Sequence, residues 1–91
     1  MKDLSESVLT VKKYGKINIH LKELMDEKGM KRNTLASLVG TRFEVIKKWY
    51  EGEVEKLDLD VLARVCYVLG CEPADIIKYD KTVEIEAENE N

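Results

Sequence analysis

Apolar residues recur at helical spacing along most of the chain, and several of these runs stop at a glycine. The spacing predicts five short helices, at approximately residues 18–28, 31–39, 42–50, 59–69 and 73–77. Gly29, Gly40 and Gly70 follow the first, second and fourth of them. A glycine ends a helix well because it adopts a positive φ without a Cβ penalty. The pattern therefore indicates an all-α domain of five helices.

The central element is the stretch from Lys31 to Gly52, which reads as two helices joined by a tight glycine turn. We expect apolar side chains of both helices to point inward: Leu35, Ala36, Leu38, Val39, Val45, Ile46, Trp49 and Tyr50. The small side chain of Ala36 lets the second helix cross close over the first. A helix pair of this length and turn is the helix-turn-helix, and the outer face of its second helix fits a DNA major groove.

The remaining helices are expected to complete the core. The first buries Leu21, Leu24 and Met25, with Ile17 just ahead of them. The fourth has Asp58 as its N-cap and buries Leu59, Leu62, Val65, Cys66 and Leu69. Val61, Tyr67 and Val68 fall outside that face, and part of this surplus apolar surface is expected to be exposed to a partner. The fifth is capped by Glu72, starts at Pro73 and turns Ile76 and Ile77 inward.

The two ends of the chain follow another pattern. Residues 8–11 are rich in β-branched side chains and fit a short strand, whereas residues 12–16 read as a basic arm. Apolar residues alternate with glutamate over 83–87, which fits a strand, but the acidic composition fits a disordered tail equally well. The predicted organisation is an arm or strand in 1–16, a helix-turn-helix domain in 17–79, and an acidic tail or strand in 80–91.

Several residues in family order make the chain resemble the Cro and phage-repressor helix-turn-helix proteins, the xenobiotic-response-element (XRE) family. They are Leu24-Met25, Lys28-Gly29-Met30, Leu35-Ala36, Val39-Gly40, Ile46, Trp49, Gly52, Leu59 to Arg64, Leu69-Gly70, Pro73 and Ile76-Ile77. The resemblance covers residues 17–79. It implies a compact five-helix lambda-repressor-like fold, to which short terminal β segments can be added. It also implies sequence-specific binding of double-stranded DNA as a homodimer, mostly for repression.

The charge distribution supports a DNA partner although the net charge of −3 does not. Residues 28–48 hold six cationic side chains and only Glu44 as an acid, a net charge of +5, so the rest of the chain carries −8. The positive charge therefore lies on the predicted helix-turn-helix, where phosphates would be met. The linker with Glu53 and Glu55 departs from the family pattern and would repel the DNA backbone.

The resemblance places DNA contacts at the start of the second helix and on the outer face of the third. The candidate DNA-binding residues are Arg32, Asn33, Thr41, Arg42, Phe43, Glu44, Lys47 and Lys48. Arg32 and Asn33 are assigned to phosphates, as is one of the two lysines. Arginine and lysine can donate to guanine, glutamate can accept from cytosine, and phenylalanine can pack on the thymine methyl group.

Two of these assignments have structural alternatives. Thr41 and Glu44 also fit a T-x-x-E capping box, which would engage Glu44 at the helix start instead of with a base. Phe43 also fits a position folded back into the core. Lys31 and Thr34 stand where the family often has a capping box on the second helix, so that box is expected to be absent.

No chemistry beyond binding is indicated. Cys66, Cys71 and His20 do not supply the four ligands of a structural zinc, and we interpret both cysteines as apolar fillers of the core. No glycine-rich phosphate loop or acid–base pair is visible, so we expect no enzyme, cofactor, metal or small-molecule substrate. No apolar run approaches the roughly 20 residues of a membrane span and no signal peptide is visible, which predicts a cytoplasmic protein.

Two functions follow from the sequence. The first is a transcriptional regulator, a repressor that binds a near-palindromic operator as a homodimer. The alternative is a module of the same fold that binds protein, such as an antitoxin or the partner of a regulator, with weak or no DNA binding. The +5 stretch favours the first function, and the acidic linker and tail favour the second.

Overall fold

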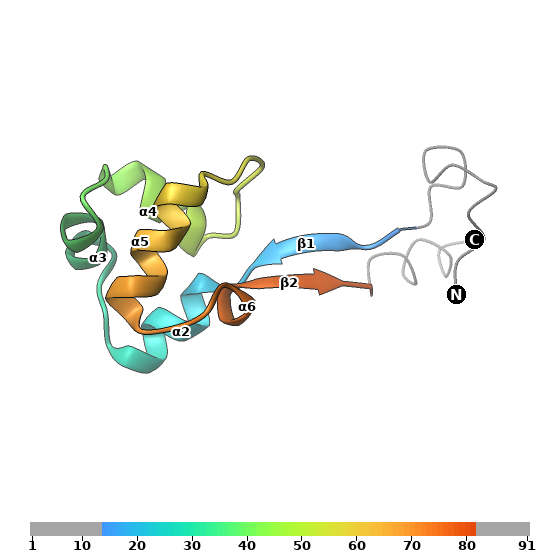
Figure 1. The fold of residues 1–91 in the computed structure, drawn as a ribbon, viewed down its shortest axis with the longest axis horizontal. Coiled ribbons are helices and arrows are strands. Elements are labelled where there is room, and N and C mark those ends of the chain that lie inside the picture. The colour runs from blue at the N-terminus through green and yellow to red at the C-terminus, as the bar shows by residue number, and fades with distance from the viewer. Residues whose placement is uncertain (1–13, 82–91) are drawn as a thin grey trace. The chain divides into compact units, whose positions relative to one another are not determined.

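The computed structural model describes residues 14–81, which form five helices and two short strands (Figure 1). The elements are β1 (Lys16–Ile19), α2 (Leu21–Lys28), α3 (Arg32–Val39), α4 (Phe43–Tyr50), α5 (Leu59–Leu69), α6 (Pro73–Ile76) and β2 (Ile77–Asp80). The five predicted helices are therefore confirmed. The strands predicted at residues 8–11 and 83–87 lie outside the described residues.

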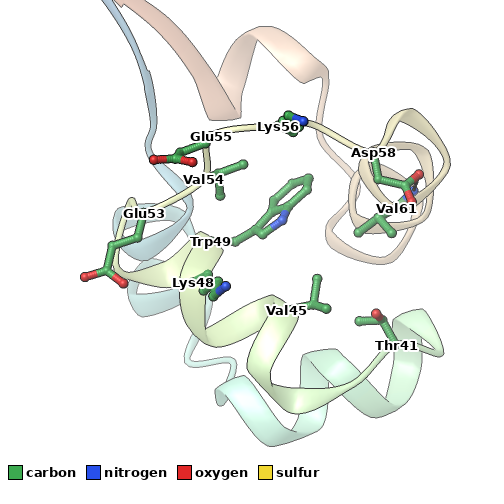
Figure 2. Close-up of a pocket in the computed structure, with 10 residues that line it drawn as sticks. All are labelled: Thr41, Val45, Lys48, Trp49, Glu53, Val54, Glu55, Lys56, Asp58 and Val61. Carbon is green, nitrogen blue, oxygen red and sulfur yellow. Dashed lines mark hydrogen bonds between the residues drawn. The ribbon is translucent and has the colours of Figure 1, made fainter.

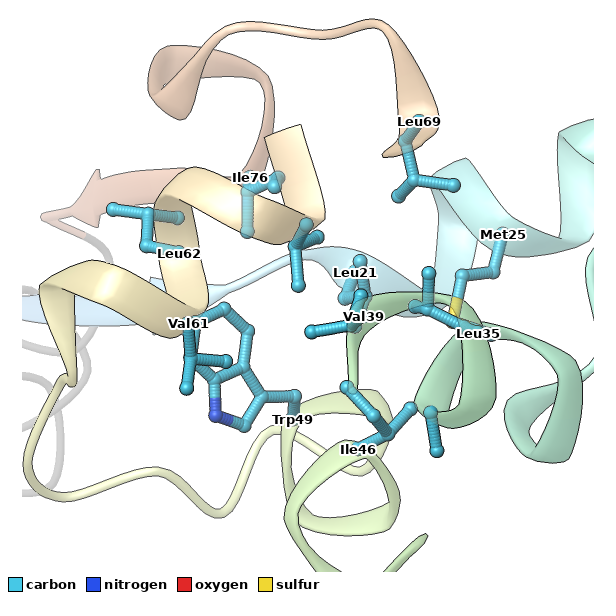
Figure 3. Packing of buried hydrophobic residues seen from close by; sticks show 12 residues of the cluster. Leu21, Met25, Leu35, Val39, Ile46, Trp49, Val61, Leu62, Leu69 and Ile76 are labelled. Atoms are coloured by element: carbon cyan, nitrogen blue, oxygen red, sulfur yellow. The ribbon is translucent and has the colours of Figure 1, made fainter. Parts of the chain in front are cut away.

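A single cluster of apolar side chains holds the helices together (Figure 3). Its buried members are Leu21, Met25, Leu35, Ala36, Val39, Ile46, Trp49, Val61, Leu62, Val65, Leu69 and Ile76. All five helices contribute to it, so each helix depends on its neighbours to remove its apolar face from water. Among residues 14–81, no polar or charged residue is fully buried.

The helix ends follow the predicted signals. Gly29, Gly40 and Gly70 end α2, α3 and α5 with φ values of 67°, 78° and 64°. The Asp58 carboxylate accepts hydrogen bonds from the backbone N–H groups of Asp60 and Val61, at 2.9 and 3.2 Å, and so caps α5. Lys31 precedes α3 without a side-chain cap, as expected from its sequence.

On α3 and α5, the predictions about burial were wrong at three positions. Leu38 is 58% exposed and Leu59 is 73% exposed, whereas Val61 is buried. On α3, the core face runs through Leu35, Ala36 and Val39, and Leu38 lies about 100° round the helix from Val39. On α5, the core face runs through Val61, Leu62, Val65 and Leu69, and Leu59 lies in the first turn outside it. Hydrophobicity alone does not decide which of two adjacent apolar stripes turns inward.

The first helix is shorter than predicted because a strand precedes it. The sequence suggested a helix start near Asn18, but Lys16–Ile19 forms β1, and α2 begins at Leu21. β1 pairs with β2 in a two-stranded sheet whose arrows run in opposite directions in Figure 1. Ile77 therefore begins β2 and does not extend the last helix. Ile17 lies in β1 and is 58% exposed, so it does not join the buried stripe of α2.

The chain divides into two compact units. Residues 18–78 form the helical unit, in which the His20 N–H donates to the Ile76 carbonyl at 2.6 Å. The described residues of the other unit are 14–17 and 79–81. There the Gly15 N–H donates to the Tyr79 hydroxyl at 2.8 Å, and a Cβ at Gly15 would collide with the Asp80 carbonyl oxygen. Glycine is therefore required at that position.

Both cysteines are free and half-buried against the core. Cys71 follows Gly70, and its N–H donates to the Cys66 carbonyl at 3.0 Å, a bond typical of a helix that ends in a left-handed glycine. Burial raises the pKa of the Cys71 thiol to about 11, so it stays protonated at neutral pH. These positions fit the interpretation of both side chains as apolar fillers.

Candidate nucleic-acid interface

The turn at Gly40 joins α3 to α4, and the two helices pack against each other. The N–H groups of Gly40 and Thr41 both donate to the Ala36 carbonyl, at 2.9 and 3.0 Å, and this closes the end of α3. Ala36 itself is 4% exposed, because its small side chain lies in the packed contact. α4 buries Ile46 and Trp49, so its opposite face is left to solvent.

The outward face of α4 carries the residues predicted for it. Arg42, Glu44, Lys47 and Lys48 are all exposed, Arg42 as the N-cap residue. Asn33 is exposed at the start of α3, and Phe43 and Arg32 are half-buried. The eight candidate DNA-binding residues therefore lie on the pair α3 and α4 or in the turn between them, but the structure groups them in an unexpected way.

Arg32, Asn33 and Phe43 line the first hollow. It has a volume of about 360 Å³, and Met30, Lys31 and Tyr50 complete its wall. The Arg32 guanidinium carbon lies 5.6 Å from the centre of the Phe43 ring and 5.1 Å from that of Tyr50. Stacking of this kind fixes a guanidinium while leaving its N–H groups free to donate. Arg32 is thus oriented before any ligand is bound.

The position of Phe43 answers one question that the sequence left open. It is neither fully exposed nor folded into the core, since it packs against the Arg32 guanidinium at the first hollow. The other alternative, a capping box of Thr41 and Glu44, is wrong. Arg42 is the N-cap residue of α4 and no side chain caps that helix, so Glu44 is not engaged there.

Lys47 lies on the same side of α4 as Arg32. Its ammonium group is 3.3 Å from the Glu51 carboxylate, one turn further along. The Arg32 guanidinium approaches the same carboxylate to 3.9 Å. Two of the candidate cations therefore share one acid, Glu51, which was not singled out from the sequence. The i, i+4 spacing of Lys47 and Glu51 was the available signal.

Thr41 and Lys48 line a second hollow on the other side of α4 (Figure 2). Its volume is about 630 Å³, and Val45, Trp49, Val54 and Val61 supply its apolar wall. Glu53, Glu55, Lys56 and Asp58 stand around it. Lys47 and Lys48 are thus adjacent in sequence but meet different surroundings, and Lys48 shares its hollow with the linker glutamates.

A third group of side chains fixes the end of α4 against α2. The Tyr50 hydroxyl donates to the Asp26 carboxylate at 2.9 Å, and the Lys22 ammonium donates to the same carboxylate at 2.8 Å. Lys22 also lies 5.6 Å from the centre of the Tyr50 ring. Tyr50 was expected to point inward, and this network was not foreseen from the sequence, because no local spacing joins residues 26 and 50.

The network shifts the pKa of each of its members. The hydrogen bond from Lys22, followed by the one from Tyr50, holds the pKa of Asp26 below its ordinary value of 3.8. The hydrogen bond to Asp26 raises the pKa of Lys22 and of Tyr50. A carboxyl group with a lowered folded-state pKa stabilises the fold above its unfolded-state pKa, and this contribution is lost as the pH falls through the folded-state pKa.

We expect Lys22→Gln to raise the pKa of Asp26 toward its ordinary value, and Tyr50→Phe to raise it less, because Lys22 is the larger cause of the shift. Carboxyl carbon chemical shifts recorded between about pH 2 and 6 measure this. In the same range, the wild-type melting temperature should lose the Asp26 contribution below about pH 4. An unchanged Asp26 titration in Lys22→Gln would contradict the assigned contact.

Within residues 14–81, no group of three or more His, Cys, Asp and Glu side chains is placed to hold a metal ion. His20 lies at the start of α2, with its Nδ1 atom 3.8 Å from the Glu23 carboxylate. None of the helices in the described part of the chain has the length and apolar character needed to cross a membrane.

A family profile and solved structures match most of the chain. The sequence profile of the Cro/C1-type HTH DNA-binding domain matches residues 20–82. A protein from Bacteroides fragilis, provisionally assigned as DNA-binding, has a similar fold, with a TM-score of 0.62, 24% identity, and coverage of 69% of this chain and 100% of that one. The transcriptional regulator VanUg is similar with a TM-score of 0.60, 24% identity, and coverage of 87% of this chain and 96% of that one. No curated protein matches the chain.

Proposed function

The chain belongs to the family of Cro/C1-type helix-turn-helix DNA-binding domains, and from this premise we propose that it is a sequence-specific regulator of transcription. We further propose that it acts as a repressor, bound as a homodimer to a near-palindromic operator in the cytoplasm. The observation that carries the proposal is the exposed outer face of α4, where Arg42, Glu44, Lys47 and Lys48 project from a helix anchored by Ile46 and Trp49.

The proposed contacts divide between bases and phosphates. We assign contacts with base edges in the major groove to four residues at the start or on the outer face of α4, namely Arg42, Phe43, Glu44 and Lys48. Arg32 and Asn33 at the start of α3 and Lys47 on α4 are assigned to phosphates, and Thr41 in the turn to the backbone near Lys48. Phosphate contacts would supply most of the affinity, and base contacts would set the sequence.

A homodimer would place two copies of α4 in successive major grooves, about 34–36 Å apart. Exposed apolar side chains on α5 support self-association, since Tyr67 is 88% exposed and Leu59 is 73% exposed. For the organisation of the chain, we retain residues 17–79 as the DNA-binding domain, with 1–16 and 80–91 as flanking segments.

The second candidate function is a protein-binding module of the same fold. It is favoured by the acids near the candidate interface, namely Glu51 beside Lys47 and Arg32, and Glu53 and Glu55 beside Lys48. Such acids weaken an interaction with phosphates. The exposed face of α5 would then serve a different protein.

Binding to random-sequence duplex DNA separates the two functions. We expect a dissociation constant that rises steeply between about 50 and 200 mM salt, because Lys47 and Arg32 each release counterions when they meet a phosphate. Fluorescence anisotropy of a labelled duplex measures it. Selection from a random duplex pool should then yield a two-fold symmetric site. No binding at about 50 mM salt would favour the protein-binding module.

A further inference from the structure

Glu51 lies among the cationic side chains of the candidate interface. Its carboxylate is 3.3 Å from the Lys47 ammonium and 3.9 Å from the Arg32 guanidinium. Lys47 and Arg32 come from different helices of the helix-turn-helix, and both are assigned to DNA phosphates. The side chains of all three are a third to a half exposed, so the group is open to solvent and to a ligand.

We propose that the Glu51 carboxylate is an internal competitor for the DNA phosphates. In the free protein it forms ion pairs with Lys47 and Arg32, which DNA phosphates would otherwise neutralise. These ion pairs must break when a phosphate approaches. Glu51 thereby limits the affinity of this protein for DNA and reduces its salt dependence. This inference rests on the proposed function, because it assigns a regulatory residue to the same site.

The chemistry of the two ligands makes the competition direct. A carboxylate and a phosphate both accept charge-assisted hydrogen bonds from ammonium and guanidinium groups. An ion pair this exposed is worth little by itself, so a correctly placed phosphate can displace it. The displaced carboxylate remains near the DNA backbone as an uncompensated negative charge, and the repulsion persists in the complex.

The rings beside Arg32 make the effect of removing Glu51 predictable. Besides its contact with Glu51, the Arg32 guanidinium lies 5.6 Å from the centre of the Phe43 ring and 5.1 Å from that of Tyr50, and these ring contacts do not involve Glu51. Neutralising Glu51 should therefore leave the Arg32 side chain oriented and make its positive charge available to a DNA phosphate. If Arg32 depended on Glu51 for its orientation, the same change would weaken DNA binding.

Glu53 provides a matched control. It carries the same charge, lies two residues further along the chain and is exposed. No salt bridge joins it to a cation among residues 14–81. Glu51→Gln and Glu53→Gln therefore remove equal charge from neighbouring positions, but only Glu51→Gln releases cations of the candidate interface.

The experiment compares the full-length wild type, Glu51→Gln and Glu53→Gln on a labelled random-sequence duplex, by anisotropy between about 50 and 200 mM salt. We expect Glu51→Gln to bind about 5- to 10-fold more tightly near 100 mM salt, with a slope of log K against log salt steeper by about one unit. Glu53→Gln should gain less than half of this. In a Lys47→Gln background, the gain from Glu51→Gln should shrink.

The outcomes distinguish the inference from the proposed function. If the wild type binds duplex DNA and Glu51→Gln binds equally or less tightly, the role of Glu51 is refuted and the proposed function stands. An equal gain in Glu53→Gln would also refute it, because the effect would then be general charge. If neither the wild type nor Glu51→Gln binds while both melt as folded proteins, the proposed function fails as well.

Discussion

Reversing the charge of Lys47 and Lys48 together, as Lys47→Glu/Lys48→Glu, is expected to weaken binding to duplex DNA by about 100-fold or more near 100 mM salt. Lys47, assigned to a phosphate, contributes roughly tenfold at this salt concentration through counterion release. Lys48, assigned to a base edge, contributes a contact worth about 1–3 kcal/mol. The reversal also leaves Glu51 beside a new glutamate, since Lys47 is its partner at 3.3 Å, and this adds repulsion of the DNA backbone.

Both lysines are exposed, so the double variant should remain folded. The matched control is Lys78→Glu/Lys81→Glu, which changes the net charge equally at exposed positions outside the helix-turn-helix. Anisotropy titrations of both variants, with thermal melts followed by circular dichroism, measure the effect. Equal loss of binding in the two variants would mean that net charge, and not the outer face of α4, governs the interaction.

The second large effect concerns stability and compares one substitution at two positions of α3. Leu35→Ala is expected to lower the free energy of unfolding by about 2–5 kcal/mol, because Leu35 is fully buried and its removal leaves a cavity in the core. Leu38→Ala is expected to change it by no more than about 0.5 kcal/mol, because Leu38 is 58% exposed.

Urea denaturation of both variants, followed by circular dichroism, gives the two free energies. The two leucines share the helix, the residue type and the intrinsic helix propensity, so the difference between the variants isolates burial. A loss at Leu38 comparable to that at Leu35 would show that the face of α3 around Leu38 is covered in solution. Self-association would then have to be tested by repeating the experiment at several protein concentrations.

The α3–α4 pair and the start of α5 could be derived from the sequence because their signals are local. Gly40 ends α3 with a φ of 78°, and it was identified from its place after an apolar stripe. Asp58 caps α5 through backbone N–H groups two and three residues away. A cap or a helix-ending glycine acts within one turn of chain, so the residue type and its spacing carry the information.

The candidate residues of the interface could also be named from the sequence, but the way in which they group could not. Arg32 and Lys47 were named separately, and only the folded chain shows that both approach Glu51. The contacts of the Arg32 guanidinium with the Phe43 and Tyr50 rings join two helices, so no spacing along either helix predicts them. Such contacts depend on the crossing of α3 and α4, which the packing of their side chains determines.

The sequence by itself determined five helices, the glycines that end three of them, and a cationic helix-turn-helix in an acidic chain. Only the tertiary structure decided that Leu38 and Leu59 face solvent, that Val61 is buried, and that Lys16–Ile19 pairs with Ile77–Asp80 as strands. The reason is the range of the forces involved. Helix periodicity and capping are set by neighbours in sequence, whereas the buried stripe of a helix and the partner of a strand are set by surfaces that meet only when the chain is folded.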